Sequence, residues 1–225
     1  MSSPARAPRN SLTRDRVVRQ ALALADRDGI AVLTIRALAA ECGVKPMAIY
    51  HHIASKEAIL DAIVDAVFEE IYLPRADRPW REELAHRSRS MREALGRHPW
   101  ALSLMEARRN PGPANLQGHE ACLEVLRTHG FSLPATAHAY AVLDAFVYGF
   151  SLQEAMLDQI DLEGSAPELI ESMDLARYPR LMEFATQHVL AEDYSFANSF
   201  DVGLDLVLDA LERVRSAYGG PDAPE

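Results

Sequence analysis

Apolar residues recur at intervals of three and four along most of the chain, and no segment shows the strict alternation of a half-buried β-strand. A first helix is predicted between Thr13, as its N-cap, and Gly29, which suits the position after a helix end. Thr34 is expected to cap a second helix, which Gly43 ends. A short third helix is predicted from Pro46 to Ile53, because the first helical turn leaves unpaired the N–H that proline lacks.

A longer fourth helix is predicted from its N-cap, Ser55, to the residues before Pro74. Proline and glycine then interrupt the helical pattern around residues 74–79, 110–113, 130, 164–167 and 179. Two of the later helices, at residues 134–157 and 196–214, are apolar on more than one face. Such helices must be covered on both sides, either within one core or, as we favour, by symmetry mates in a dimeric four-helix bundle. The predicted fold class is all-α.

Residues 34–53 have the spacing of a helix-turn-helix: a capped helix, a turn around Gly43, and a second helix that presents its N-terminal end. Many helical bundles contain a glycine turn between two helices. On this segment alone, DNA binding and a purely structural role therefore both stay open.

The net charge of −10 hides an asymmetry between two parts of the chain. Residues 1–56 contain nine Arg or Lys and four Asp or Glu, whereas residues 57–225 contain fourteen and twenty-nine. DNA phosphates should attract the first part and repel the second. The charge distribution therefore favours a nucleic-acid partner for the N-terminal segment.

The composition, with 48% apolar and 25% charged residues, is that of a globular protein. The first residues lack the apolar stretch of a signal sequence, and no apolar run is long enough to cross a bilayer, so we expect a cytoplasmic protein with no membrane partner. The two cysteines, Cys42 and Cys122, give neither a disulfide framework nor a paired-cysteine zinc pattern. No metal and no cofactor is predicted.

The segment TIRALAAECGVKPMAIYHHIASKEAIL, which begins at Thr34, resembles the N-terminal domain of TetR-family repressors. The positions that match the family's pattern are Thr34, Arg36, Gly43, Val44, Tyr50, His51 and Lys56. The resemblance extends back to Leu12, and residues 130–150 and 200–212 look like the dimerising helices of the tetracycline-repressor branch.

This resemblance implies a three-helix helix-turn-helix DNA-binding domain followed by a larger helical domain for ligand binding and dimerisation. We accordingly expect a disordered basic arm at 1–12, the DNA-binding domain at 13–56 and the larger domain at 57–225. The implied partners are a double-stranded DNA operator, a small-molecule effector, and a second copy of the chain bound through the helices at about 134–157 and 196–214.

The resemblance also places side chains at the major-groove end of the recognition helix: Lys45, Pro46, Met47 and Ala48. Only exposed side chains there reach base edges, and Lys45 is the candidate for reading guanine. Pro46 and Ala48 offer apolar contact alone.

Phosphate contacts are expected from the hydroxyls of Thr34 and Tyr50, from His52, and from Lys56 at a helix N-terminus. Arg36 is either a base or phosphate contact or a solvated surface arginine. If His52 faces DNA, its neighbour His51 should pack against the adjacent helix.

In the larger domain, an ungapped comparison with the tetracycline repressor places five residues at drug-contacting positions: Arg87, Met91, Met105, Arg108 and Cys122. Met105 falls where the family has a magnesium-binding histidine, and a thioether is a poor ligand for a hard cation. A pocket that also contains Trp100, Phe146 and Phe150 would suit an apolar or aromatic molecule. For each of these residues, ordinary core packing is the competing interpretation.

Two other classes of function compete with a repressor. No phosphate loop, HExxH metal motif or nucleophile elbow is present, so an enzyme is not expected. A helical small-molecule-binding or interaction protein without specific DNA binding would explain the acidic body but not the basic segment. We therefore predict a repressor that a small effector releases from a near-palindromic operator.

Overall fold

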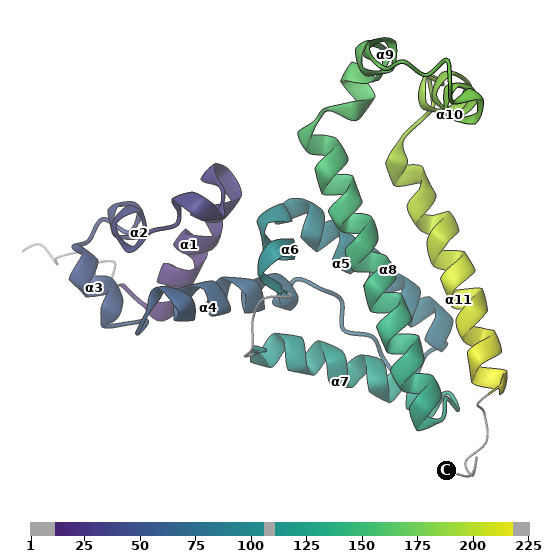
Figure 1. Cartoon of the computed structure of the whole chain (residues 1–225). Coiled ribbons are helices and arrows are strands. Elements are labelled where there is room, and N and C mark those ends of the chain that lie inside the picture. The colour runs from purple at the N-terminus through teal and green to yellow at the C-terminus, as the bar shows by residue number, and fades with distance from the viewer. Residues whose placement is uncertain (1–11, 106–110, 218–225) are drawn as a thin grey trace, which may run out of the picture. The chain divides into compact units, whose positions relative to one another are not determined.

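The computed structural model describes residues 12–105 and 111–217, and over this range the chain is helical with no β-strand (Figure 1). The described residues form two compact units: one contains the chain up to Glu70 together with residues 100–116, and the other contains residues 71–99 and the chain from Gln117 onward. The first unit thus extends past residue 56, where the sequence places the end of the DNA-binding domain. That functional boundary stays a prediction.

The first unit is built on four helices and a short 3-10 turn: α1 (Arg14–Asp28), η1 (Ile30–Val32), α2 (Ile35–Glu41), α3 (Pro46–Tyr50) and α4 (Lys56–Glu69). Helix α1 packs on α2 and α4, and α2 packs on α3. The side chains that fill this core are fully or almost fully buried: Val17, Ala21, Leu38, Ile49 and Ile63. These side chains lie on the apolar faces of the predicted helices, so the hydrophobic pattern of the sequence correctly indicated which sides of these helices pack inward.

The three predicted N-caps are confirmed. The hydroxyl of Thr13 accepts a hydrogen bond from the backbone N–H of Arg16 at 3.2 Å, and Thr34 and Ser55 accept from the third residue of α2 and α4 at 3.1 Å. Gly29, after α1, has φ +83°, a backbone conformation that other residues rarely adopt. The sequence therefore sets the ends of these helices through local chemistry.

Two further contacts complete the first unit. The indole Nε1 of Trp100, at the start of α6 (Pro99–Met105), donates to the Asp26 carboxylate at 2.7 Å. The Asp65 carboxylate on α4 accepts from the backbone N–H groups of Ala114 and Asn115, at 3.0 and 3.2 Å. These N–H groups belong to the first turn of α7 (Pro113–Thr128), so Asp65 caps a helix that has only glycine, Gly112, at its own cap position.

The second unit contains α5 (Trp80–Arg97), the larger part of α7, α8 (Leu133–Gln159), α9 (Leu162–Ser172), α10 (Pro179–Phe184), a π turn (Ala185–Val189), a 3-10 turn (Phe196–Asn198) and α11 (Ser199–Ala217). Helices α5 and α11 both pack on α8, the longest helix, and α11 also packs on α5. Between α8 and α11, a Cβ atom at Gly203 would lie 2.7 Å from the Phe146 ring, so glycine permits this close approach.

Three helix boundaries differ from the sequence-based prediction. Helix α3 ends at Tyr50 instead of Ile53, and α4 ends at Glu69, some residues before Pro74. The predicted break at residues 164–167 is wrong, because α9 runs through Pro167. The chain turns earlier, at Asp161, whose φ of +47° is in the left-handed region that aspartate tolerates better than most residues.

Candidate functional site

A tight turn joins α2 to α3 and holds the two helices as a helix-turn-helix. Gly43 has φ +68°, and the backbone N–H groups of Gly43 and Val44 return to the carbonyls of Ala40 and Ala39 at 3.0 and 2.9 Å. Lys45 is extended, as a residue before proline should be, and Pro46 starts α3. Ile49 is fully buried, so one side of α3 packs inward and the opposite side is left for a partner.

The residues predicted to read base edges lie on the outward side of α3. Lys45 and Pro46 are exposed, Met47 is 69% exposed, and Ala48 is half-buried. Met47 adds apolar surface to this side of α3, directly beside the cation of Lys45. The first turn of α3 therefore presents one cation and an apolar surface together.

Most of the side chains predicted to contact phosphates are exposed in the first unit. Tyr50 is 43% exposed, and Lys56 and Arg36 are exposed near the N-termini of α4 and α2. Thr34 is exposed; its hydroxyl oxygen caps α2, which leaves its hydrogen to donate outward.

The two adjacent histidines differ from the expectation. His51 is exposed and His52 is half-buried, so the prediction that His51 packs against the neighbouring helix is wrong. The reason is that α3 ends at Tyr50, and the helical directions assumed for the two rings do not continue past it.

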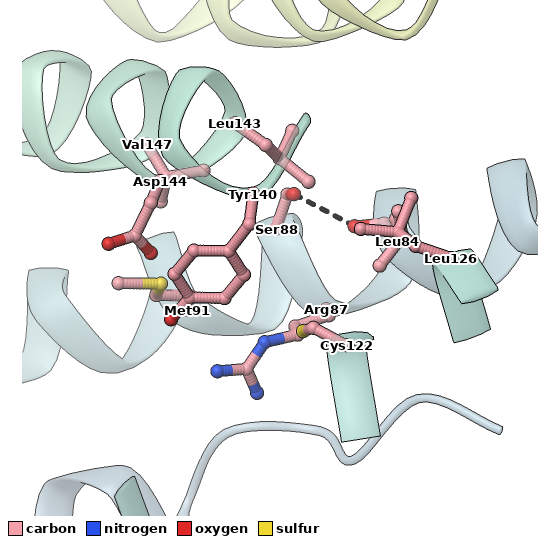
Figure 2. Close-up of a pocket in the computed structure, with 10 residues that line it drawn as sticks. All are labelled: Leu84, Arg87, Ser88, Met91, Cys122, Leu126, Tyr140, Leu143, Asp144 and Val147. Atoms are coloured by element: carbon pink, nitrogen blue, oxygen red, sulfur yellow. Dashed lines mark hydrogen bonds between the residues drawn. The ribbon is translucent and has the colours of Figure 1, made fainter. Parts of the chain in front are cut away.

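A pocket lies within the second unit, between α5, α7 and α8 (Figure 2). Ten side chains line it: Leu84, Arg87, Ser88, Met91, Cys122, Leu126, Tyr140, Leu143, Asp144 and Val147. The cavity volume open to the centre of a water molecule is about 20 Å³, which is room for about one water. The pocket is therefore narrow, and a larger molecule fits only if side chains that line it move.

Arg87 brings a buried positive charge into this pocket. Its side chain is buried, and Nη1 donates to the backbone carbonyl of Tyr72 at 3.1 Å. The guanidinium packs against Gly118 on α7, where a Cβ atom would lie 3.0 Å from Nη2. Tyr72 is fixed from its other side too, since its backbone N–H donates to the Ser90 hydroxyl at 2.9 Å.

Asp144 brings the opposite charge from α8. Burial raises the pKa of its carboxyl group, although the positive charge of Arg87 and the nearby His119 act in the opposite direction. Burial also raises the pKa of Tyr140, which lies one helical turn earlier and stacks on His119 with 4.0 Å between ring centroids. The Cys122 thiol is neutral near pH 7, because burial raises its pKa to about 11.

The structure brings together three of the eight residues predicted to bind the effector: Arg87, Met91 and Cys122 line the pocket. Trp100 and Met105 belong to the first unit, and neither lines the pocket. Arg108 lies outside the described residues. Sequence reasoning missed Tyr140 and Asp144, although a single carboxylate in the first half of a long apolar helix was a usable signal.

Phe146 and Phe150 belong to a cluster of rings between α8 and the start of α11. Phe150 stacks on Phe196 at 4.6 Å and meets Phe200 edge-on at 5.1 Å, and the Arg92 guanidinium lies 4.7 Å from the Phe200 centroid. These contacts are typical of a packed core. A role of Phe146 and Phe150 in effector binding stays a prediction.

Helices α8 and α11 each carry large apolar side chains that the single chain leaves exposed. These are Val142, Leu152 and Met156 on α8 and Val202 and Leu206 on α11, all at least 49% exposed. They fall within the two helices predicted to form the dimer. None of the helices in the described part of the chain combines the length and the apolar character needed to cross a bilayer.

An all-helical chain with an exposed helix-turn-helix and a separate helical unit that contains a pocket has the architecture of a ligand-responsive DNA-binding regulator. The family described as bacterial regulatory proteins of the tetR family matches residues 17–63, and the tetracyclin repressor-like C-terminal domain matches residues 73–215. The chain belongs to the TetR family of transcriptional regulators.

Individual relatives agree with this assignment. The transcriptional repressor DrrR1 of Streptomyces coeruleorubidus is 30% identical, over 98% of this chain and 85% of its own length. Streptomyces coelicolor ActR, solved with (S)-DNPA, superposes with a TM-score of 0.70 at 25% identity, over 93% of this chain and 100% of its own. BioQ bound to its double-stranded DNA operator gives a TM-score of 0.63 at 25% identity, over 90% of this chain and 99% of its own.

Proposed function

We propose that this protein is a homodimeric, sequence-specific repressor that a small effector with an aromatic body releases from a near-palindromic operator. The observation that carries the proposal is the outward side of α3, where Lys45, Met47 and Tyr50 are exposed directly after a capped helix and a glycine turn. BioQ, a protein of the same fold, binds its operator as duplex DNA. The proposal includes a cytoplasmic location and no catalytic activity.

In the proposed complex, the first turn of α3 enters the major groove. Lys45 donates to guanine, and Pro46, Met47 and Ala48 offer apolar contact such as that with a thymine methyl group. Thr34, Tyr50, His52 and Lys56 hold phosphates, which fixes the register of the helix but not the sequence that it reads. Arg36 is exposed on the same unit and adds a positive charge close to the DNA backbone.

The dimer is proposed to form through α8 and α11, whose exposed apolar side chains a second copy would cover. A two-fold axis then sets two recognition helices about 34–36 Å apart, which is the spacing of successive major grooves. An inverted repeat is the DNA counterpart of this symmetry.

The effector is proposed to bind in the pocket of the second unit. Because the cavity is narrow, binding selects a state in which it is wider. If that state binds the operator less well, effector and operator weaken each other's affinity to the same extent. Arg87 offers a route for this coupling: it lines the pocket and also holds the carbonyl of Tyr72, three residues after the end of α4. An effector that draws Arg87 away removes one of the hydrogen bonds that hold the segment after α4, while the bond from Tyr72 N–H to Ser90 stays.

The test is a selection of bound sequences from a random duplex library with purified protein at near-physiological salt. The proposal predicts enrichment of an inverted repeat, with an affinity that falls steeply as salt rises. If no sequence is enriched, the chain is a ligand-binding or interaction protein that keeps the fold without specific DNA binding.

A further inference from the structure

The pocket between α5, α7 and α8 contains two opposite charges that do not pair with each other. Within the described residues, no carboxylate lies within ion-pair distance of Arg87, and its guanidinium donates to the neutral carbonyl of Tyr72. A guanidinium has five N–H donors, so the carbonyl of Tyr72 and the neighbouring Cys122 side chain leave donors that a ligand can use. Cys122 does not balance the charge, because its thiol is neutral near pH 7.

Asp144 is the negatively charged group of the pocket, and like Arg87 it has no ion-pair partner within the described residues. Its half-buried carboxylate lines the same cavity, and no hydrogen bond to it is found within the described part of the chain. In the view of Figure 2, the Tyr140 ring and the Met91 side chain lie between this carboxylate and the Arg87 guanidinium. The lining of the cavity thus contains a cation, an anion, an aromatic ring and a thioether.

A purely apolar ligand does not suit this arrangement. It would exclude water from both charges and leave Arg87 with neutral partners and Asp144 with no new one, which is an unfavourable change in a protein interior. A ligand with one polar end satisfies only one of them. Both charges are satisfied by an acidic oxygen on Arg87, where bidentate hydrogen bonds are strongest, and a donor on Asp144.

We propose that the effector is an aromatic molecule with an acidic group at one edge, bound by Arg87, and a hydroxyl or amine donor at the opposite edge, bound by Asp144. This inference rests on the proposed function in taking the pocket as the effector site. It narrows the ligand to a class, amphoteric or hydroxylated aromatic acids, because two opposite charges line the pocket and the Tyr140 ring and Met91 lie between them in the view of Figure 2. Met91, a flexible side chain, is suited to move when such a ring enters.

The test measures binding of four naphthalenes by titration calorimetry to the purified full chain. The probe, 6-hydroxy-2-naphthoate, has both groups; 2-naphthoate lacks the hydroxyl and 2-naphthol lacks the acid. Naphthalene-2-methanol is compared with 2-naphthoate, whose acid it replaces by a neutral group. Removing either group should weaken binding about tenfold or more, as the loss of a charge-assisted hydrogen bond does. These comparisons use the unaltered protein, so they do not depend on whether a variant folds.

Variants then assign each preference to its residue. In Arg87→Met the preference for the acid should disappear, whereas Arg87→Lys should retain part of it. In Asp144→Ala the preference for the hydroxyl should disappear. The matched controls are Arg75→Met and Asp77→Ala, which remove an ion pair that is 56% and 63% exposed in the same unit, and both should bind the four compounds as the unaltered protein does.

The inference is overturned if the four naphthalenes bind equally, if the two preferences persist in Arg87→Met and Asp144→Ala, or if the probe does not bind at about 1 mM. These outcomes are separate from those of the operator selection. If an inverted repeat is enriched but binding shows no preference for the acid and the hydroxyl, the proposed ligand class is wrong and the proposed repressor function stands. If binding shows both preferences but no sequence is enriched, the ligand class stands and the repressor function is wrong.

Discussion

The outward side of α3 and the pocket between α5, α7 and α8 use polar side chains in opposite ways. Lys45 and Tyr50 lie in solvent, so their charge and hydroxyl lose water only when a partner binds. Arg87 and Asp144 have already lost much of theirs on folding. The outward side of α3 can therefore be altered at little cost to the fold, whereas the pocket is part of the core that holds its unit together.

The largest effect should be on the chemical reactivity of the pocket. Burial raises the pKa of Cys122 to about 11, so at pH 8 roughly one thiol in a thousand is ionised, against about a quarter for an ordinary cysteine. Alkylation of Cys122 by iodoacetamide, followed by peptide mass spectrometry, should be at least about 100-fold slower than that of a free thiol. The rate should rise about tenfold per pH unit between pH 7 and 9, and a plateau near pH 8.5 would show that the pocket is open to water.

The next largest effect is a difference in the free energy of unfolding between substitutions of buried and of exposed apolar side chains. Leu84 is 1% exposed in the pocket wall, and Leu84→Ala should lower the free energy of unfolding by about 3 kcal/mol, the cost of lost burial and a cavity. Met47→Ala on α3 should change it by less than about 0.5 kcal/mol. Denaturant unfolding measures both, and equal losses would contradict the contrast between the two regions.

A third prediction concerns Gly112, next to the carboxylate that caps α7. A Cβ atom there would lie 2.1 Å from Cγ of Asp65, so Gly112→Ala must displace this side chain from two backbone N–H groups. The expected loss of stability is about 2 kcal/mol. The control is Gly96→Ala in α5, where the added atom meets nothing within 4 Å and alanine should be neutral or stabilising. Equal effects at the two glycines would show that the cap by Asp65 contributes nothing.

The smallest effect is expected for exposed ion pairs. Arg81 on α5 pairs with Asp209 on α11 at 2.8 Å, but the two side chains are 38% and 64% exposed. Arg81→Ala should therefore lower the free energy of unfolding by less than about 1 kcal/mol, and added salt should reduce the difference further. A loss as large as that of Leu84→Ala would mean that this surface is buried in the assembled protein.

The elements of the first unit were predictable because local chemistry sets them. Thr13, Thr34 and Ser55 each cap the helix that follows, and Gly43 supplies the left-handed turn between α2 and α3. Each of these signals can be recognised from a few neighbouring residues of the sequence. Pro167 shows the limit of such signals. A helix can include a proline when another residue, here Asp161, makes the turn.

The pocket was less predictable because it depends on which face of each helix turns inward. Periodicity marks Phe146 and Phe150 as apolar, but only the packed structure shows that they contact Phe196 and Phe200. Asp144 lies on the same helix and lines the pocket instead. No local sequence pattern tells a residue of the ring cluster from a residue of the pocket, since both roles depend on contacts between residues distant in sequence.

The most direct test of the central claim compares Lys45→Ala and Tyr50→Phe with the unaltered protein on the selected operator and on variants with single base-pair changes. The account predicts that both variants stay folded and lose affinity, that Lys45→Ala also relaxes specificity at one base pair in each half-site, by about 1–3 kcal/mol, and that Tyr50→Phe weakens all sequences equally. If neither substitution changes binding, α3 is not the recognition helix.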